Sequence, residues 1–272
     1  MINLLLKYGE RPLKSGMTIN SKYLIKKVLG MGSYGITYLT EDIHCRKSAV
    51  VKQLRAYKAR SSKGLLSFMR EADIQSSMRN SAFPDFYESF KWEKKHFISM
   101  EYVEAETFED LIFIKKEAYG EKESFHILLK VLRAVKILHD NGIVHRDLRI
   151  PNILMKNQSI HIIDFGLARR LNDSNEVFKS ETKYSKEKIL LREVSYQSDF
   201  FALGHFVLFL LYSGYVPSSR KSRSWEDELE LSAFAKEIIK RMLKLLKPYD
   251  SIDELIVEVL KCADGREQNV IF

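Results

Sequence analysis

Two short polar clusters, joined by two apolar runs, constrain this chain more than any other feature of its sequence. The first cluster, His145-Arg146-Asp147-Leu148-Arg149-Ile150-Pro151-Asn152, precedes Ile153-Leu154-Met155, and the second, Asp164-Phe165-Gly166, follows Ile160-His161-Ile162-Ile163. The residues between the apolar runs, Lys156-Asn157-Gln158-Ser159, are typical of a turn between two β-strands. We therefore predict a β-hairpin that carries one polar cluster at the outer end of each strand.

The residue types in these clusters point to phosphoryl transfer. A carboxylate and an amide oxygen, both of which these clusters contain, are hard ligands that suit Mg²⁺. A separate carboxylate can orient and deprotonate a hydroxyl group. Positioning and charge neutralisation do most of the work in phosphoryl transfer, and this set of groups supplies both.

The two clusters also resemble a known family. The first is similar to the catalytic loop of the eukaryotic-type (Hanks-type) protein kinases, and Asp164-Phe165-Gly166 is similar to their metal-binding triplet. The resemblance implies that Asp147 is the catalytic base and that Asn152 and Asp164 bind Mg²⁺, with Mn²⁺ as an alternative metal. Arg149 stands where serine/threonine kinases usually have lysine and some tyrosine kinases have arginine. It would offset charge on the transferred phosphoryl group.

A glycine-rich turn, Gly30-Met31-Gly32-Ser33-Tyr34-Gly35, lies between the strand-like stretches Tyr23–Leu29 and Ile36–Thr40. A dinucleotide-binding fold would need a helix directly after the glycines, and β-branched and aromatic residues follow instead. The turn resembles the kinase loop that covers the phosphates of ATP. Its proposed nucleotide contacts are Gly30, Gly32, Ser33, Tyr34 and Gly35.

Lys52 ends the apolar run Ala49-Val50-Val51, and resembles the strand lysine that contacts the inner phosphates of the nucleotide. Residues 65–78 show helical spacing of apolar side chains. Glu71 on this predicted helix resembles the family's partner for the strand lysine. Gln75, one turn further on, stands where the family usually has an apolar residue. We predict that Gln75 needs a polar partner or water and makes the active position of the helix less self-stabilising.

The base-binding residues follow from the resemblance alone. Thr37 and Val50 stand where the family usually has valine and alanine, which indicates a slightly altered adenine pocket. Residues 96–103 resemble the hinge strand, with Met100 behind the adenine and the backbone of Glu101 and Val103 hydrogen-bonded to the base.

Residues 167–188 resemble the activation segment, which Arg146 would order after phosphorylation. We expect self-phosphorylation within residues 174–185, where the hydroxyl-bearing candidates are Ser174, Ser180, Thr182, Tyr184 and Ser185. The usual A-P-E ending is missing. Glu187 is the nearest match to its glutamate, and we predict an ion pair between Glu187 and Lys247.

The resemblance implies an α+β, two-lobed protein-kinase-like fold with a β-rich N-lobe and a mainly helical C-lobe. We predict a lead-in over residues 1–19, the N-lobe over 20–102 and the C-lobe over 103–272. The apolar stretch 200–212 is interrupted by Gly204-His205 and is predicted to be a buried helix rather than a membrane span. The resemblance implies that Asp199, directly before this stretch, binds the backbone of the catalytic loop. A cap at the start of the helix is the alternative role, and the two roles could coexist.

Composition adds expectations about partners and location. The chain has 272 residues, a net charge of +8 and two distant cysteines, which favours a reducing cytoplasm. Residues 43–70 contain no acidic side chain, which indicates either solvated surface or attraction of acidic partners. No nucleic-acid motif accompanies this stretch, so we do not expect a nucleic-acid partner.

These features together predict an ATP-dependent serine/threonine protein kinase that acts on protein substrates and on itself. It would resemble bacterial members of the family without a membrane anchor. A small-molecule kinase of the same fold and a weakly active ATP-binding regulatory module remain alternatives.

Overall fold

The computed structural model describes residues 10–173, 185–217 and 223–265. The chain divides into two compact units, one of Met1–Glu104 with Phe165–Leu167 and one of Ala105–Asp164 with Ala168–Phe272. We call them unit 1 and unit 2. The lobe boundary at residues 102 and 103 and the lead-in over 1–19 stay predictions, since the first nine residues lie outside the described part of the chain.

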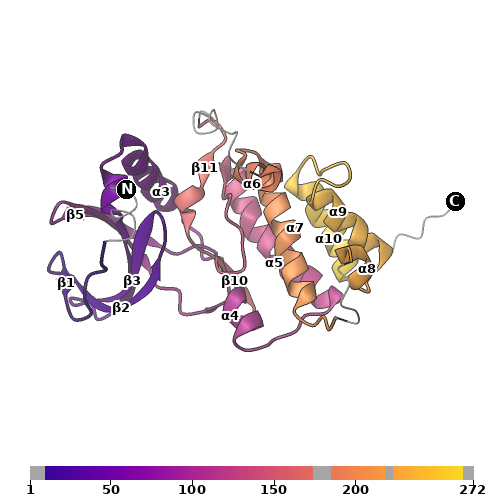
Figure 1. Ribbon diagram of the computed structural model, residues 1–272, viewed down its shortest axis with the longest axis horizontal. Coiled ribbons are helices and arrows are strands. Elements are labelled where there is room, and N and C mark those ends of the chain that lie inside the picture. The colour runs from indigo at the N-terminus through magenta and orange to yellow at the C-terminus, as the bar shows by residue number, and fades with distance from the viewer. Residues whose placement is uncertain (1–9, 174–184, 218–222, 266–272) are drawn as a thin grey trace. The chain divides into compact units, whose positions relative to one another are not determined.

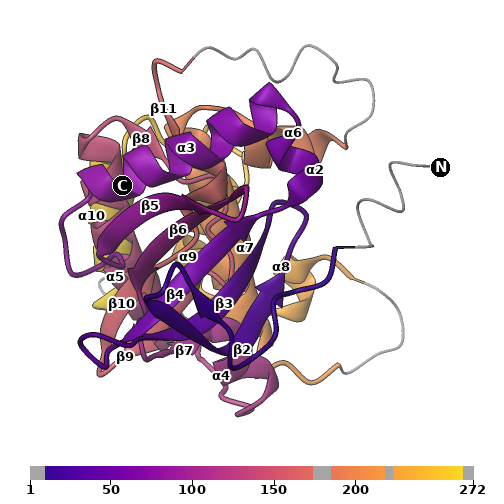
Figure 2. The ribbon, with the colours of Figure 1, turned by 90° about the vertical axis from the view of Figure 1, so that its left-hand side faces the viewer.

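Unit 1 is built on a six-stranded antiparallel sheet with the strand order β1-β2-β3-β4-β6-β5. Figure 2 labels the strands β2 to β6 of this sheet. The strands are β1 (Thr18–Ile19), β2 (Tyr23–Met31), β3 (Gly35–Asp42), β4 (Ser48–Leu54), β5 (Phe86–Trp92) and β6 (Lys95–Glu101). Strands β2 and β3 form the hairpin whose turn contains the glycine-rich sequence. The sheet therefore places this turn beside β4, which carries Lys52.

The two faces of this sheet bury different side chains because residues alternate along a strand. On one face, Ala49 and Val51 of β4 belong to an apolar cluster around Tyr23. On the other, Val50 and Leu54 pack with Phe68 of α3 (Ser62–Ser77). Helix α3 thus lies across one face of the sheet and follows the short helix α2 (Ala56–Ala59) (Figure 2).

Unit 2 is mainly helical (Figure 1). Its helices are α4 (Phe108–Phe113), α5 (Glu121–Asp140), α6 (Lys186–Arg192), α7 (Tyr196–Tyr212), α8 (Trp225–Glu228), α9 (Ala233–Met242) and α10 (Ile252–Ala263). Helix α5 packs against α7 and α10, and α7 also packs against α9. A Cβ atom on Gly204 would lie 2.8 Å from Leu243 Cδ2, so glycine at this position lets α7 approach the end of α9 closely.

The predicted buried helix over residues 200–212 is confirmed as the larger part of α7, whose residues are mostly buried. Among the described residues, no single helix combines the length and the apolar character that crossing a membrane requires. Helices α6 and α7 meet that test only when they are joined, and they are bent by 118° relative to one another.

The predicted hairpin is confirmed as β9 (Ile153–Lys156) and β10 (Ser159–Ile162). Asn157 and Gln158 between them have φ values of 48° and 68°, as the two central residues of a type I′ turn require. A third strand, β7 (Glu106–Thr107), pairs with β9. Two further short strands, β8 (Ile143–Val144) and β11 (Arg169–Arg170), form a separate pair.

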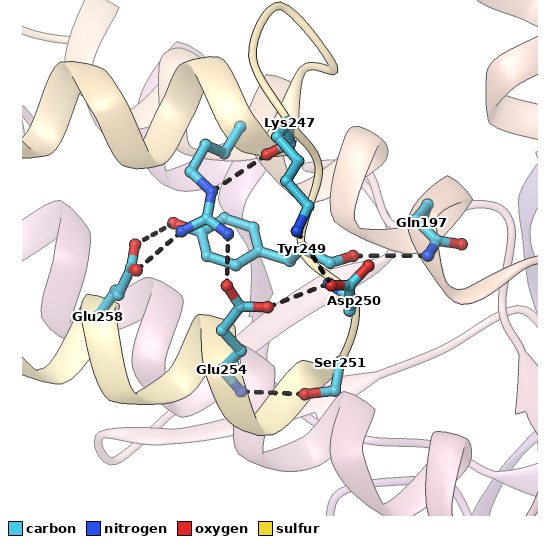
Figure 3. Close-up of polar contacts among 8 residues, drawn as sticks. Gln197, Lys247, Tyr249, Asp250, Ser251, Glu254 and Glu258 are labelled. Atoms are coloured by element: carbon cyan, nitrogen blue, oxygen red, sulfur yellow. Dashed lines mark hydrogen bonds and ion pairs between the residues drawn. The ribbon is translucent and has the colours of Figure 1, made fainter.

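The predicted ion pair between Glu187 and Lys247 is wrong. Lys247 Nζ lies 3.6 Å from Asp250 Oδ2, three residues along the chain, as Figure 3 shows. Arg241 rather than Lys247 makes the tight contacts in this region, since it donates to Glu254 and Glu258 of α10. The basic side chain described nearest to Glu187 is that of His205, at 3.8 Å between Nε2 and Oε1, and burial lowers the pKa of this imidazole.

Candidate active site

In the glycine-rich turn, the position of Gly35 is too crowded for a larger residue. A Cβ atom on Gly35 would lie 2.9 Å from Gln53 O and 3.4 Å from Lys52 Cγ. Arg55, which directly follows β4, makes two hydrogen bonds to the turn. Its side-chain Nε donates to Gly32 O at 3.1 Å, and its backbone N–H donates to Tyr34 O at 3.1 Å. No motif in the sequence indicates this role for Arg55, which depends on the hairpin folding beside β4.

Tyr34 lies in the turn with 39% of its surface exposed. Lys58 Nζ lies 4.2 Å from the centre of its ring, within the range of a cation–π contact. The described residues therefore hold both the backbone and the exposed aromatic side chain of this turn. The nucleotide contacts predicted for Gly30, Gly32, Ser33, Tyr34 and Gly35 stay predictions.

Lys52 and Glu71 form a buried ion pair within unit 1. Lys52 Nζ lies 2.5 Å from Glu71 Oε1, and the two side chains are only 11% and 4% exposed. Strand β4 supplies the lysine and α3 supplies the glutamate, so packing of the helix on the sheet brings the pair together. The pairing predicted between these two residues is thus present in the geometry.

Gln75 has the polar partner that its burial demands. The side chain is 2% exposed, and its Nε2 donates to Met100 Sδ at 3.2 Å. A thioether sulfur is a weak acceptor, so this bond compensates the buried amide only in part. Gln75 and Glu71 both face the sheet from α3, and the contact with Met100 therefore affects the helix that positions Glu71.

Replacing Gln75 by leucine is expected to raise the free energy of unfolding by about 1 kcal/mol, because a buried amide with a weak acceptor is removed. We also expect faster basal phosphate incorporation, since α3 would hold Glu71 against Lys52 more firmly. Urea unfolding and initial rates with labelled ATP measure the two effects. Ser76→Ala, an exposed change on the same helix, is the control. An unchanged rate in Gln75→Leu contradicts the expectation.

Most of the residues predicted to surround the base lie on neighbouring strands of unit 1, and Val103 follows the end of β6. Val50 of β4 is opposite Met100 of β6, and Thr37 of β3 is opposite Lys52. The Glu101 N–H donates to Asp85 O at 2.8 Å, so a contact of Glu101 with a base would have to use its carbonyl. The adenine contacts of these residues and of Val103 stay predictions.

In unit 2 the catalytic-loop sequence begins directly after β8, and Asp199 holds its backbone. The Asp199 carboxylate accepts the N–H groups of His145 and Arg146 at 2.9 and 2.7 Å. Arg146 has a φ of 65°, a conformation that non-glycine residues adopt only where the surroundings enforce it. The predicted contact of Asp199 with the catalytic loop is therefore seen in the structure. The capping role is not, because Ser195 is the N-cap of α7 and Asp199 lies within its first turn.

His139 is a further partner of Asp199 that the sequence did not reveal. Its Nε2 lies 3.0 Å from Asp199 Oδ2, and its ring stacks on Tyr196 with 4.2 Å between centroids. In the sequence His139 is one more residue in the last turn of a helix, without any motif around it. Burial lowers the pKa of the neighbouring His145 and keeps its imidazole neutral.

Asp199→Asn is expected to lower the free energy of unfolding by about 2 kcal/mol, because one of two carboxylate oxygens that accept buried N–H groups is replaced by a donor. Urea unfolding of the purified chain measures the loss. Asp140→Asn, whose side chain is 57% exposed, is the matched control and should stay near the wild type. Equal stability of the two variants contradicts the role given to Asp199.

The Asp147 carboxylate is fixed by two neighbours in the same loop. Arg149 donates to it through two nitrogens, Nε to Oδ1 at 2.8 Å and an Nη to Oδ2 at 3.2 Å. Asn152 Nδ2 donates to Asp147 Oδ2 and to its backbone oxygen, both at 2.9 Å. The bond to Asp147 raises the pKa of Arg149, whose side chain remains 59% exposed. The arrangement holds a carboxylate in one orientation beside an accessible positive charge.

Asn152 and Asp164 offer oxygen atoms that suit a divalent cation. Ile163 N–H donates to Asn152 O at 3.0 Å, so the backbone brings Asp164 beside Asn152 at the end of the β9–β10 hairpin. Both bonds described for the Asn152 side chain use Nδ2, which leaves Oδ1 as a ligand. No group of three or more His, Cys, Asp or Glu side chains suited to a metal occurs within the described ranges. One carboxylate, one amide oxygen, water and phosphate oxygens are nevertheless the usual set for Mg²⁺.

The predicted phosphorylation sites Ser174, Ser180, Thr182 and Tyr184 lie outside the described residues. Ser185, the last candidate, caps α6, since its hydroxyl accepts the Lys188 N–H at 3.3 Å. Ser185 is exposed and therefore accessible to modification.

Comparisons with known proteins agree with this geometry. The profile described as "Protein kinase domain" matches residues 23–263. The "Probable serine/threonine-protein kinase YbdM" of Bacillus subtilis (strain 168) is 35% identical over 240 residues, which cover 88% of this chain and 89% of that protein. The serine/threonine-protein kinase PrkC of the same strain is 32% identical over 213 residues, which cover 76% of this chain and 33% of PrkC.

Among solved structures, the PknI kinase domain of Mycobacterium tuberculosis superposes with a TM-score of 0.70, at 19% sequence identity, over 93% of this chain and 100% of that one. This likeness confirms the predicted α+β kinase-like fold with a β-rich part and a helical part. The family resemblance drawn from the catalytic clusters is likewise confirmed by the profile and the bacterial relatives. The chain belongs to the protein kinase family.

Proposed function

We propose that this chain is an ATP-dependent protein kinase that transfers the γ-phosphoryl group to serine and threonine hydroxyls of proteins. The observation that carries the proposal is the Asp147 carboxylate, held by Arg149 and Asn152 beside Asp164. The relatives named as serine/threonine kinases support the choice of hydroxyl. Family membership implies the use of ATP and a divalent metal.

The two units contribute different groups to the reaction. In unit 1, the glycine-rich turn and Lys52 bind the phosphates of ATP, and Glu71 fixes the lysine. In unit 2, Asp147 orients the substrate hydroxyl and accepts its proton as the oxygen attacks the γ-phosphorus. The bond to the β,γ-bridging oxygen breaks and ADP leaves. Arg149 offsets negative charge on the transferred group.

Asn152 and Asp164 would hold Mg²⁺, with Mn²⁺ as the alternative, and the metal would neutralise phosphate charge when bound. We further propose self-phosphorylation within residues 174–185. Cys45 and Cys262 are both free thiols, which supports a reducing location such as the cytoplasm.

The test is incorporation of label from γ-labelled ATP by the purified chain, with a generic protein substrate and either Mg²⁺ or EDTA. Asp147→Asn serves as the inactive control. We expect label on serine and threonine that needs Mg²⁺ and is lost in the variant, and mass spectrometry then locates self-modified residues. ATP binding without incorporation into either protein would instead favour a regulatory module or a small-molecule kinase.

A further inference from the structure

Three successive backbone carbonyl groups at the tip of the glycine-rich turn are held from one side. Arg55 Nε donates to Gly32 O, and the Arg55 N–H donates to Tyr34 O, each at 3.1 Å. Between them, the hydroxyl group of Tyr57 in α2 donates to Ser33 O. The carbonyl groups of residues 32–34 therefore all point towards the short stretch that begins with Arg55.

These bonds determine which way the N–H groups of the turn face. In a planar trans peptide, the C=O of one residue and the N–H of the next point in opposite directions. Because the carbonyl groups of residues 32–34 point towards Arg55 and Tyr57, the N–H groups of residues 33–35 point away from them. Successive N–H groups on one side of a turn are suited to binding phosphate oxygens. The proposed function assigns that task to this turn.

Arg55 is itself held by Glu10, the first residue that the structure describes. Arg55 Nη1 donates to Glu10 O at 3.2 Å, and the N–H of Ala56 donates to Glu10 Oε2 at 2.8 Å. The other carboxylate oxygen, Oε1, accepts from Gln53 Nε2 at 2.9 Å. Glu10 thus bonds to Arg55 and to residues on both sides of it in the sequence. Arg55 is only 6% exposed, so its position depends on these partners.

The chain around Glu10 is fastened to the sheet, which gives Glu10 a defined place. The Leu13 N–H donates to the Tyr38 hydroxyl at 3.1 Å, and that hydroxyl donates to Gln53 Oε1 at 3.0 Å. Burial raises the pKa of Tyr38, which keeps the hydroxyl protonated and able to donate. The side chain of Leu13 packs against the apolar cluster around Tyr23. Both ends of the buried Gln53 amide are therefore bonded, and Nε2 is directed at Glu10.

We propose that Glu10 is a positioning residue for ATP binding: it holds Arg55, and Arg55 together with Tyr57 directs the N–H groups of the glycine-rich turn towards the nucleotide phosphates. This role rests on the proposed function, because phosphate binding by the turn is what gives these N–H groups a ligand. Glu10 touches no phosphate in this scheme and acts through residues 53–56. It lies outside residues 23–263, which the kinase profile matches, so family membership alone does not indicate this role.

The experiment compares the affinities of the full chain for ATP with Mg²⁺ and for adenosine by titration calorimetry. Adenosine has no phosphate, so its Kd depends on the contacts of the base and ribose. Glu10→Ala removes both carboxylate oxygens. It should raise the Kd for ATP about fivefold and leave the Kd for adenosine within about twofold of the wild type. Arg55→Met removes the side-chain donors and should raise the Kd for ATP about tenfold.

Tyr57→Phe tests the same arrangement with a smaller change. It keeps the ring and removes the hydroxyl group that donates to Ser33 O. The KM for ATP should rise about threefold, with kcat and the KM for a generic protein substrate within about twofold of the wild type. A general loosening of unit 1 would instead lower kcat and weaken adenosine binding as well.

Glu41→Ala is the matched control for Glu10→Ala. Glu41 also accepts from two partners, Lys26 and Arg46, but it lies near the end of β3 that is remote from the glycine-rich turn. Its Kd for ATP should equal that of the wild type. Urea unfolding of every variant shows which of them are folded before affinities are compared.

The outcomes separate this role from the proposed function. If folded Glu10→Ala binds ATP as the wild type does, or loses affinity for ATP and adenosine in equal proportion, the role of Glu10 is overturned and the kinase activity stands. If Glu10→Ala does not fold, Tyr57→Phe decides, and an unchanged KM for ATP overturns the arrangement. A wild-type chain that binds no ATP overturns both the proposed function and this role.

Discussion

Asp147→Asn is expected to lower kcat for phosphate transfer about a thousandfold, the middle of the range for loss of a general base. Asparagine keeps the size of the side chain but cannot accept the proton of the substrate hydroxyl. It also presents an amide to the donors of Arg149 and Asn152, which now bond to the carboxylate at 2.8 to 3.2 Å. The orientation of the group is therefore lost together with its basicity.

The KM for ATP in Asp147→Asn should stay within about twofold of the wild type, because Asp147 is proposed to contact the substrate hydroxyl rather than ATP, and a change confined to the transition state lowers kcat alone. Steady-state rates with a generic substrate give both constants. Asp250→Asn, which removes a carboxylate that is 80% exposed, should match the wild type. A loss of less than about tenfold in Asp147→Asn would be too small for a general base and would reject its assignment.

The parts of the fold that the sequence predicted are those that local patterns determine. The β9–β10 hairpin follows from two apolar runs around a polar turn, and its left-handed residues Asn157 and Gln158 fall where the turn was predicted. The pairing of Lys52 with Glu71 required one long-range contact, between a strand and the next long helix. The motifs of the family predict this contact, whereas composition and the periodicity of apolar residues do not.

The contacts that the sequence did not predict depend on distant elements. His139 meets Asp199 only because α5 and α7 pack together. Gln75 meets Met100 only because α3 packs on the face of the sheet that carries Met100. The wrong pair, Glu187 with Lys247, joined residues 60 positions apart, whereas Asp250 lies three positions from Lys247. Lys247 and Asp250 lie in the same connection between α9 and α10, whereas a pair with Glu187 of α6 depends on long-range packing that no local pattern reveals.

Substitutions in the buried pair of Lys52 and Glu71 are expected to affect stability and phosphate transfer independently. Lys52→Met should lower the free energy of unfolding by about 3 kcal/mol, because the Glu71 carboxylate, 4% exposed, is left in the interior without this cation. Phosphate incorporation should fall about a hundredfold or more, since the lysine would no longer hold the nucleotide phosphates. Lys26→Met is the control, because Lys26 pairs with Glu41 at the surface and should cost less than about 1 kcal/mol.

The double variant Lys52→Met with Glu71→Leu removes both charges and should recover most of the lost stability, to within about 1 kcal/mol of the wild type. Its phosphate incorporation should remain as low as that of Lys52→Met, because an apolar pair packs the interior but offers nothing to a phosphate. Urea unfolding and labelled-ATP incorporation on the same preparations measure the two quantities. Recovery of both would mean that the pair serves only to hold α3 on the sheet. Recovery of stability alone assigns Lys52 to the reaction.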